Sequence, residues 1–267
     1  MTNFLDGSIF AAALADGRFI AALMIAILSG VLRGFSGFGS ALIYIPLMSA
    51  VYEPRIAATT LLLIDFVSAT PFAVRAFPQC NWRAVAPMTI AAAIALPIGT
   101  MALLVVDPAT LRWVISGLVL ILLAVLASGW RYRGRPALPV TIGVGFLSGL
   151  GSGAVQVAGP PVIIYWLGSA KDAATMRASL MVYFMFTGAI GCIAYVSQGV
   201  FTPQSIALSL LLGPPFVLAM VLGARWFGGA SEDGYRRVAY AIIAVAALVS
   251  VPVFDQLLRP AAESAIK

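Results

Sequence analysis

Residues 30–46 read GVLRGFSGFGSALIYIP. This glycine-rich stretch interrupts an apolar run over 19–50. One continuous helix of about 32 residues would be roughly 48 Å long, which exceeds the roughly 30 Å hydrocarbon core of a bilayer. The stretch therefore predicts two half-helices joined by a break, as in a re-entrant hairpin.

A second long apolar run, 138–168, is broken in a similar way. It contains GLGSG at 149–153 and then GPP at 159–161. Six further runs each have the length of one membrane-crossing helix: 54–75, 84–104, 111–129, 173–197, 204–225 and 235–254. The pattern predicts an all-α, polytopic helical membrane protein.

The composition excludes a water-soluble globular domain. Of the 267 residues, 61% are hydrophobic and 10% are charged, and the mean hydropathy is +1.02, whereas soluble proteins carry roughly 25% charged residues. The net charge of +6 comes from basic residues scattered between apolar runs, so no basic stripe indicates nucleic acid. With no histidine and two cysteines, we predict neither a metal site nor a cofactor.

Landmarks of the first half recur in the second half. Gly30, Gly34 and Pro46 fall on Gly145, Gly149 and Pro161 at one constant separation, and Gly99 and Arg112 fall on Gly223 and Arg236. We therefore predict one membrane domain made of two repeats, 1–135 and 136–267. Each repeat would hold one broken or re-entrant helical hairpin and three transmembrane helices, a common construction among transporters.

The basic residues favour hairpins over spanning segments, because cytoplasmic loops collect Lys and Arg. If the two broken segments span the membrane, the basic residues divide almost evenly between its faces. If the segments re-enter, the division is about two to one. The second arrangement gives three crossings per half, so the repeats would be inverted and both termini would be periplasmic.

The breaks are the candidate binding site. Irregular backbone at membrane depth is tolerated only where it is buried in protein or lines a wet cavity. We expect the second half-helices to begin near Ser40 and Ala154, where helix N-termini attract anions. The predicted substrate-binding residues are Arg33, Gly34, Ser36, Gly37, Gly39, Ser40, Gly149, Gly151, Ser152, Gly153 and Gln156. The alternative is that the glycines only allow close helix packing.

Two charged residues, Arg33 and Asp65, fall well inside predicted membrane segments. An Asp or Arg at the centre of a membrane helix costs about 2.5 to 3.5 kcal/mol on insertion scales, so such residues usually have a functional reason. Asp65 either pairs with Arg33 or takes up a proton during transport. A purely structural hydrogen bond of Asp65 is the alternative.

The glycine-rich stretch at 30–46 and its counterpart at 145–161, together with RIAATTL at 55–61 and RASL at 177–180, resemble the TauE/SafE sulfite exporter family, also called the toluene sulfonate uptake permease family. The resemblance covers nearly the whole chain. It implies a multi-pass secondary transporter of the bacterial inner membrane. The implied substrate is sulfite, a sulfonate or a related organosulfur anion, and the implied energy source is an ion gradient.

The residues and the resemblance together favour a proton-coupled anion transporter that works by alternating access. An uncoupled anion channel and a membrane-embedded enzyme are the alternatives. No paired catalytic carboxylates or nucleophile–base pair stand out in the sequence, so we do not expect an enzyme. The expected partners are a small anionic substrate and membrane lipids, and a homodimer is left open.

Overall fold

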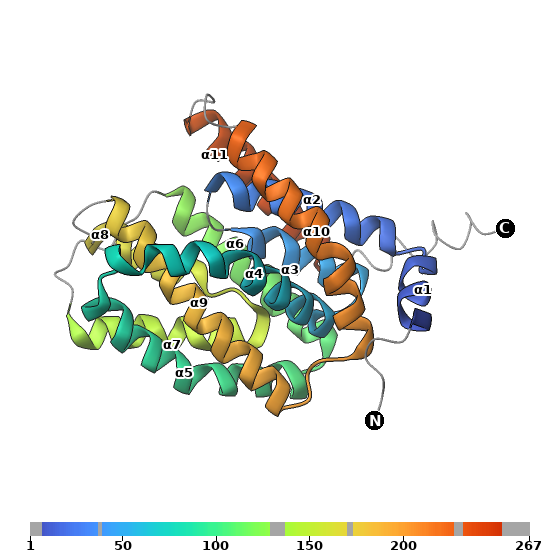
Figure 1. The fold of residues 1–267 in the computed structure, drawn as a ribbon, viewed down its shortest axis with the longest axis horizontal. Coiled ribbons are helices and arrows are strands. Elements are labelled where there is room, and N and C mark those ends of the chain that lie inside the picture. Colours follow the sequence, from blue (N-terminus) through green and yellow to red (C-terminus); the bar gives the residue numbers. More distant parts are fainter. Residues whose placement is uncertain (1–6, 37–38, 129–136, 170–172, 227–231, 253–267) are drawn as a thin grey trace.

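The computed structural model describes residues 7–36, 39–128, 137–169, 173–226 and 232–252, and the regular structure in these ranges is helical (Figure 1). The helices are α1 (Gly7–Ala15), α2 (Phe19–Ser36), α3 (Ser40–Val51), α4 (Pro54–Ala76), α5 (Trp82–Val105), α6 (Pro108–Ala127), α7 (Leu138–Val155), α8 (Gly159–Ser169), α9 (Ala173–Ser197), α10 (Pro203–Trp226) and α11 (Glu232–Val249). A short 3-10 helix, Phe77–Gln79, follows α4. The predicted all-α class is confirmed.

Six of the described helices are long and apolar enough to cross a bilayer: α4, α5, α6, α7, α9 and α10. Helices α1 and α2 pass the same criterion as a pair, although they meet at an angle of 89°. Helix α3 has 12 residues and is about 18 Å long at 1.5 Å per residue, too short to span alone. The chain is a multi-pass helical membrane protein.

The outer face of α5 is suited to lipid. Ile90, Ile94, Ile98 and Met101 recur at a helical spacing and are 51% to 63% exposed. A soluble protein rarely exposes such a row of large apolar side chains. Lipid acyl chains are as apolar as these side chains, so the row costs little in a membrane.

Both long apolar runs are broken, as the sequence predicts. Helix α2 ends at Ser36, and α3 begins at Ser40, the expected position. In the second run, α7 continues to Val155 and α8 begins at Gly159. The prediction that the second half-helix begins near Ala154 is therefore wrong by about one turn.

Helix packing explains this shift. Gly149 lies against Ala92 of α5 and Gly153 lies against Leu96, so closely that a Cβ on either glycine would collide with the α5 backbone. These contacts keep the GLGSG segment helical. The chain breaks only before Pro160 and Pro161, because proline cannot donate the backbone hydrogen bond that would continue α7.

The helix bounds relate the two halves at a separation of 119 residues. Helices α2 and α7 end at 36 and 155, α3 and α8 begin at 40 and 159, and α4 and α9 begin at 54 and 173. The sequence comparison that placed Gly30 on Gly145 and Gly34 on Gly149 is therefore out of register by one turn. Glycines stand at every fourth position in this part of both halves, so a slip of one turn still pairs glycine with glycine.

One close helix contact occurs twice, each time between the two halves. Gly30 and Gly34 of α2, in the first half, lie against the backbone of Phe216 and Met220 in α10, in the second half. Conversely, α7 of the second half meets α5 of the first half through the two glycines described above. The residue numbers rise together in both pairs, so α2 runs parallel to α10 and α7 runs parallel to α5.

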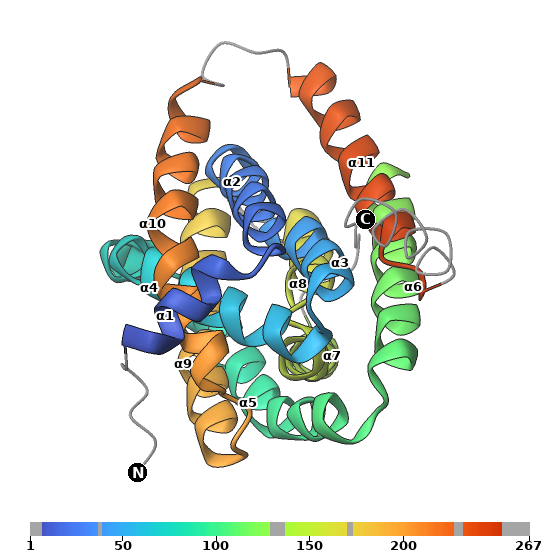
Figure 2. The ribbon, with the colours of Figure 1, turned by 90° about the vertical axis from the view of Figure 1, so that its right-hand side faces the viewer.

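Helices α4 and α9 instead pack in opposite directions. Gly188 of α9 lies against Phe66, and Gly191 lies against Leu62, so the numbers rise along one helix and fall along the other. Figure 2 shows α3 and α8 between α10 on one side and α6 and α11 on the other. Much of each short helix is buried inside the molecule.

Candidate functional site

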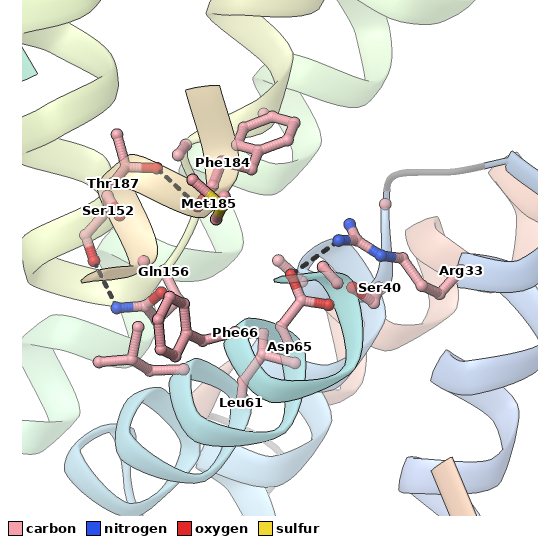
Figure 3. Close-up of a pocket in the computed structure, with 17 residues that line it drawn as sticks. Arg33, Ser40, Leu61, Asp65, Phe66, Ser152, Gln156, Phe184, Met185 and Thr187 are labelled. Carbon is pink, nitrogen blue, oxygen red and sulfur yellow. Dashed lines mark hydrogen bonds and ion pairs between the residues drawn. The ribbon is translucent and has the colours of Figure 1, made fainter. Parts of the chain in front are cut away.

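A cavity of about 70 Å³ lies where the two helix breaks meet (Figure 3). One water molecule needs about 10–15 Å³ of such space, so the cavity has room for a few water molecules or one small anion. Its wall comes from the ends of α2 and α7, the starts of α3 and α8, and the middles of α4 and α9.

Most of the wall consists of residue pairs related by the separation of 119. The pairs are Arg33 and Ser152, Gly39 and Ala158, Ser40 and Gly159, Asp65 and Phe184, Phe66 and Met185, and Ala69 and Gly188. The remaining wall residues are Ala41, Leu61, Leu62, Gln156 and Thr187. The two halves therefore contribute corresponding surfaces to one cavity.

One end of the cavity carries an ion pair. The Nη2 atom of Arg33 lies 2.9 Å from the Oδ2 atom of Asp65, and the two side chains are 11% and 27% exposed. The pairing that the sequence offered as one role for Asp65 is therefore present. The other carboxylate oxygen, Oδ1, is buried and has no hydrogen-bond partner among the described residues, so the carboxylate is only partly satisfied.

The N-terminus of α3 opens at the same end. Gly39 precedes it with a φ of 95°, in the left-handed region that glycine favours, and no side-chain oxygen caps the helix. Ser40 is buried and lines the cavity. The first N–H groups of a helix have no partner inside it and carry partial positive charge, so this end can receive an anion.

The N-terminus of α8 differs from that of α3. Pro160 and Pro161 fall in its first turn, and proline has no N–H group. The expectation that both half-helices offer equivalent backbone donors is therefore not met. The α8 terminus keeps its helix dipole but has fewer hydrogen-bond donors for an anion.

Gln156 forms the polar wall at the other end. It has a φ of 56°, a left-handed conformation that costs roughly 1–2 kcal/mol for a residue other than glycine. Its side-chain nitrogen donates hydrogen bonds to the Ser152 carbonyl oxygen at 2.9 Å and to the Tyr195 hydroxyl oxygen at 3.2 Å. The Tyr195 hydroxyl in turn donates to the Gly153 carbonyl oxygen at 2.9 Å. This network holds the strained turn at the cavity.

The structure brings six of the predicted site residues to the cavity: Arg33, Gly39, Ser40, Asp65, Ser152 and Gln156. Four glycines lie elsewhere. Gly34, Gly149 and Gly153 pack against neighbouring helices, and Gly151 approaches the carbonyl oxygen of Val157. For Gly34, Gly149 and Gly153, the geometry matches the packing alternative. The Ser36 side chain and Gly37 lie outside the described residues.

Apart from Asp65, sequence reasoning missed the wall residues that α4 and α9 supply. Phe66, Phe184 and Met185 are apolar residues inside apolar runs, and Thr187 belongs to no recognisable motif, so nothing in the sequence set these residues apart. Figure 3 shows Arg33, Ser40 and Asp65 gathered at one end and Ser152, Gln156 and Thr187 at the other. The register of 119 residues would have pointed to Phe184, because this residue of the second half corresponds to Asp65 of the first half.

Two contacts link each of α4 and α9 to the loop that follows the other helix. At one end, Arg55 donates from Nε to the Val200 carbonyl oxygen at 2.8 Å and from Nη2 to the Gly199 carbonyl oxygen. At the other end, the Asn81 backbone N–H donates to the Ser179 hydroxyl oxygen at 3.0 Å. The cavity lies between these two contacts.

A family model described as "Sulfite exporter TauE/SafE" matches residues 22–250. This range contains every residue of the cavity wall. The comparisons with curated proteins and with solved structures found no match.

Proposed function

The chain belongs to the sulfite exporter TauE/SafE family of membrane transporters, and from this premise we propose that it carries sulfite, a sulfonate or a related anion across the bacterial inner membrane by alternating access. The observation that carries the proposal is the cavity at which both helix breaks meet. Arg33 and the α3 terminus supply the positive charge there. Because the Arg33 side chain is only 11% exposed, its charge acts more strongly than it would at a surface.

We propose that residues 1–135 and 136–267 are inverted repeats, with both termini in the periplasm. The opposite directions of α4 and α9 support this arrangement, because corresponding helices of inverted halves cross the membrane in opposite directions. The constant separation of 119 residues supports the duplication. Single cysteines at positions 133 and 202 test the orientation in intact cells. External labelling should reach 202 and spare 133; the reverse pattern would refute it.

The two end contacts of α4 and α9 fit the gates of such a transporter. Arg55 closes one end through two backbone carbonyls, and Ser179 closes the other through one backbone N–H. In the proposed cycle, one contact opens while the other stays closed. The anion in the cavity then faces one side of the membrane at a time.

Asp65 is the proposed coupling residue. While it is ionised, it neutralises Arg33, and an anion must compete with it for the guanidinium group. Protonation of Asp65 would release Arg33, so one proton and one anion would bind together. A cavity that held both could cross between its two states without carrying an unpaired charge, which is costly in a low dielectric.

Flux through proteoliposomes tests the proposed class. Saturable uptake of radiolabelled sulfite or taurine that accumulates under an imposed proton gradient supports coupled transport. Conductance that neither saturates nor responds to the gradient would instead indicate a channel, and substrate turnover without flux would indicate an enzyme. The variant R33A should lose uptake, because it removes the positive charge at the cavity. R75A is the matched control, since Arg75 is exposed near the end of α4.

A further inference from the structure

The charges of the cavity come from one half only. The register of 119 residues places Ser152 where the first half has Arg33 and Phe184 where it has Asp65, and all four residues line the same cavity. Among the described residues of the wall, Arg33 is the one cation and Asp65 is the one carboxylate. A site shaped by two related halves therefore carries the charge of a single ion pair.

This asymmetry limits the charge that the cavity can hold. With Asp65 protonated, Arg33 balances one negative charge, and the α3 terminus adds only about half a positive charge. A substrate with two negative charges would leave one of them unpaired beside Phe184 and Met185, in a site with little access to water. An uncompensated charge in such surroundings is strongly unfavourable.

We propose that Ser152, as the neutral counterpart of Arg33, restricts this transporter to anions with one negative charge. The inference rests on the proposed function, since it describes which anions the same cavity accepts. It predicts that bisulfite and simple alkanesulfonates bind, and that thiosulfate and sulfoacetate, which carry two negative charges, are excluded. Ser152 is 4% exposed, so a cation introduced there would be held near the substrate.

The test compares ethanesulfonate with methanedisulfonate, which carries a second sulfonate group in place of the methyl group. Binding of each to the purified full-length protein is measured by isothermal titration calorimetry at one pH. We expect the wild type to bind ethanesulfonate at least about tenfold more tightly, the effect of one charged hydrogen bond. The variant S152R should lose or reverse this preference.

A long side chain at a buried position can prevent folding, so a second variant is needed. Gln156 lies on the same half, is longer and is partly exposed to the cavity. Q156K should therefore also admit methanedisulfonate. Q79K makes the same substitution at an exposed residue away from the cavity, and it should keep the wild-type preference.

Three outcomes would overturn the inference. The first is that the wild type binds both anions equally. The second is that folded S152R or Q156K binds ethanesulfonate and still excludes methanedisulfonate. The third is that Q79K changes the preference as Q156K does, because the effect would then come from total charge. If the wild type binds none of the four compounds ethanesulfonate, methanedisulfonate, sulfite and taurine, the proposed function itself fails.

Discussion

The substitution D65N separates anion binding from proton coupling. In the wild type, an anion must compete with the Asp65 carboxylate for Arg33, and the two groups lie 2.9 Å apart with little exposure. A hydrogen bond between charged groups contributes roughly 1.5–3 kcal/mol, and each 1.4 kcal/mol changes an equilibrium constant about tenfold. An asparagine has no charge with which to compete. We therefore expect D65N to bind sulfite about ten- to a hundredfold more tightly at neutral pH.

The pH dependence gives the second readout. In the wild type, protonation of Asp65 releases Arg33, so sulfonate affinity should rise as the pH falls. An alkanesulfonate such as ethanesulfonate is suited to this measurement, because it keeps one negative charge throughout. D65N should show the high affinity at every pH between about 5 and 8, a range in which an unperturbed carboxylate stays ionised. Accumulation driven by a proton gradient should be lost, while exchange of internal for external anion should remain.

The control is D16N, which removes the carboxylate of another aspartate–arginine pair. Asp16 pairs with Arg18 at 2.8 Å between α1 and α2, away from the cavity. The D16N variant should keep the wild-type sulfonate affinity, its pH dependence and the proton-driven accumulation. If D65N retains proton-driven accumulation, or if its sulfonate affinity has the wild-type value and pH dependence, the coupling role assigned to Asp65 is wrong.

Three further predictions concern the scaffold. G153A should lower the free energy of unfolding by about 1–3 kcal/mol, because its Cβ would meet the α5 backbone. G143A lies in the same helix, where its Cβ would have open space, and it should be neutral. Thermal unfolding in detergent measures both variants, and equal losses of stability would refute the packing argument. R55A should speed hydrogen exchange at residues 198–202 about tenfold or more, since its charged hydrogen bonds contribute roughly 1.5–3 kcal/mol; unchanged exchange would show that Arg55 does not hold this end closed. The hydrogen bond from Arg18 holds the pKa of Asp16 below its ordinary value, so the pair's contribution should be present above the ordinary aspartate pKa and be lost as the pH falls through the lowered one. Because Arg18 is half exposed, that contribution should stay below about 1 kcal/mol, and a larger loss of stability in D16N near neutral pH would contradict this.

The sequence by itself determined the environment of the chain and the presence of its breaks. Low charge and long apolar runs require a membrane, because such a surface cannot be hydrated. Runs too long for one crossing and rich in glycine and proline must be interrupted. An arginine and an aspartate inside membrane segments require a reason to be there, and the ion pair between Arg33 and Asp65 supplies one.

Only the tertiary structure decided where the second break lies and what surrounds the site. A glycine-rich segment can be a loop or a tightly packed helix, and the choice at 149–153 depends on the backbone of α5, which is distant in sequence. Likewise, the apolar wall residues of α4 and α9, such as Phe66 and Phe184, look ordinary in the sequence until the two helices pack against each other. The asymmetry between Arg33 and Ser152 becomes visible only when the helix bounds fix the register, because four-residue glycine spacing fits two registers equally well.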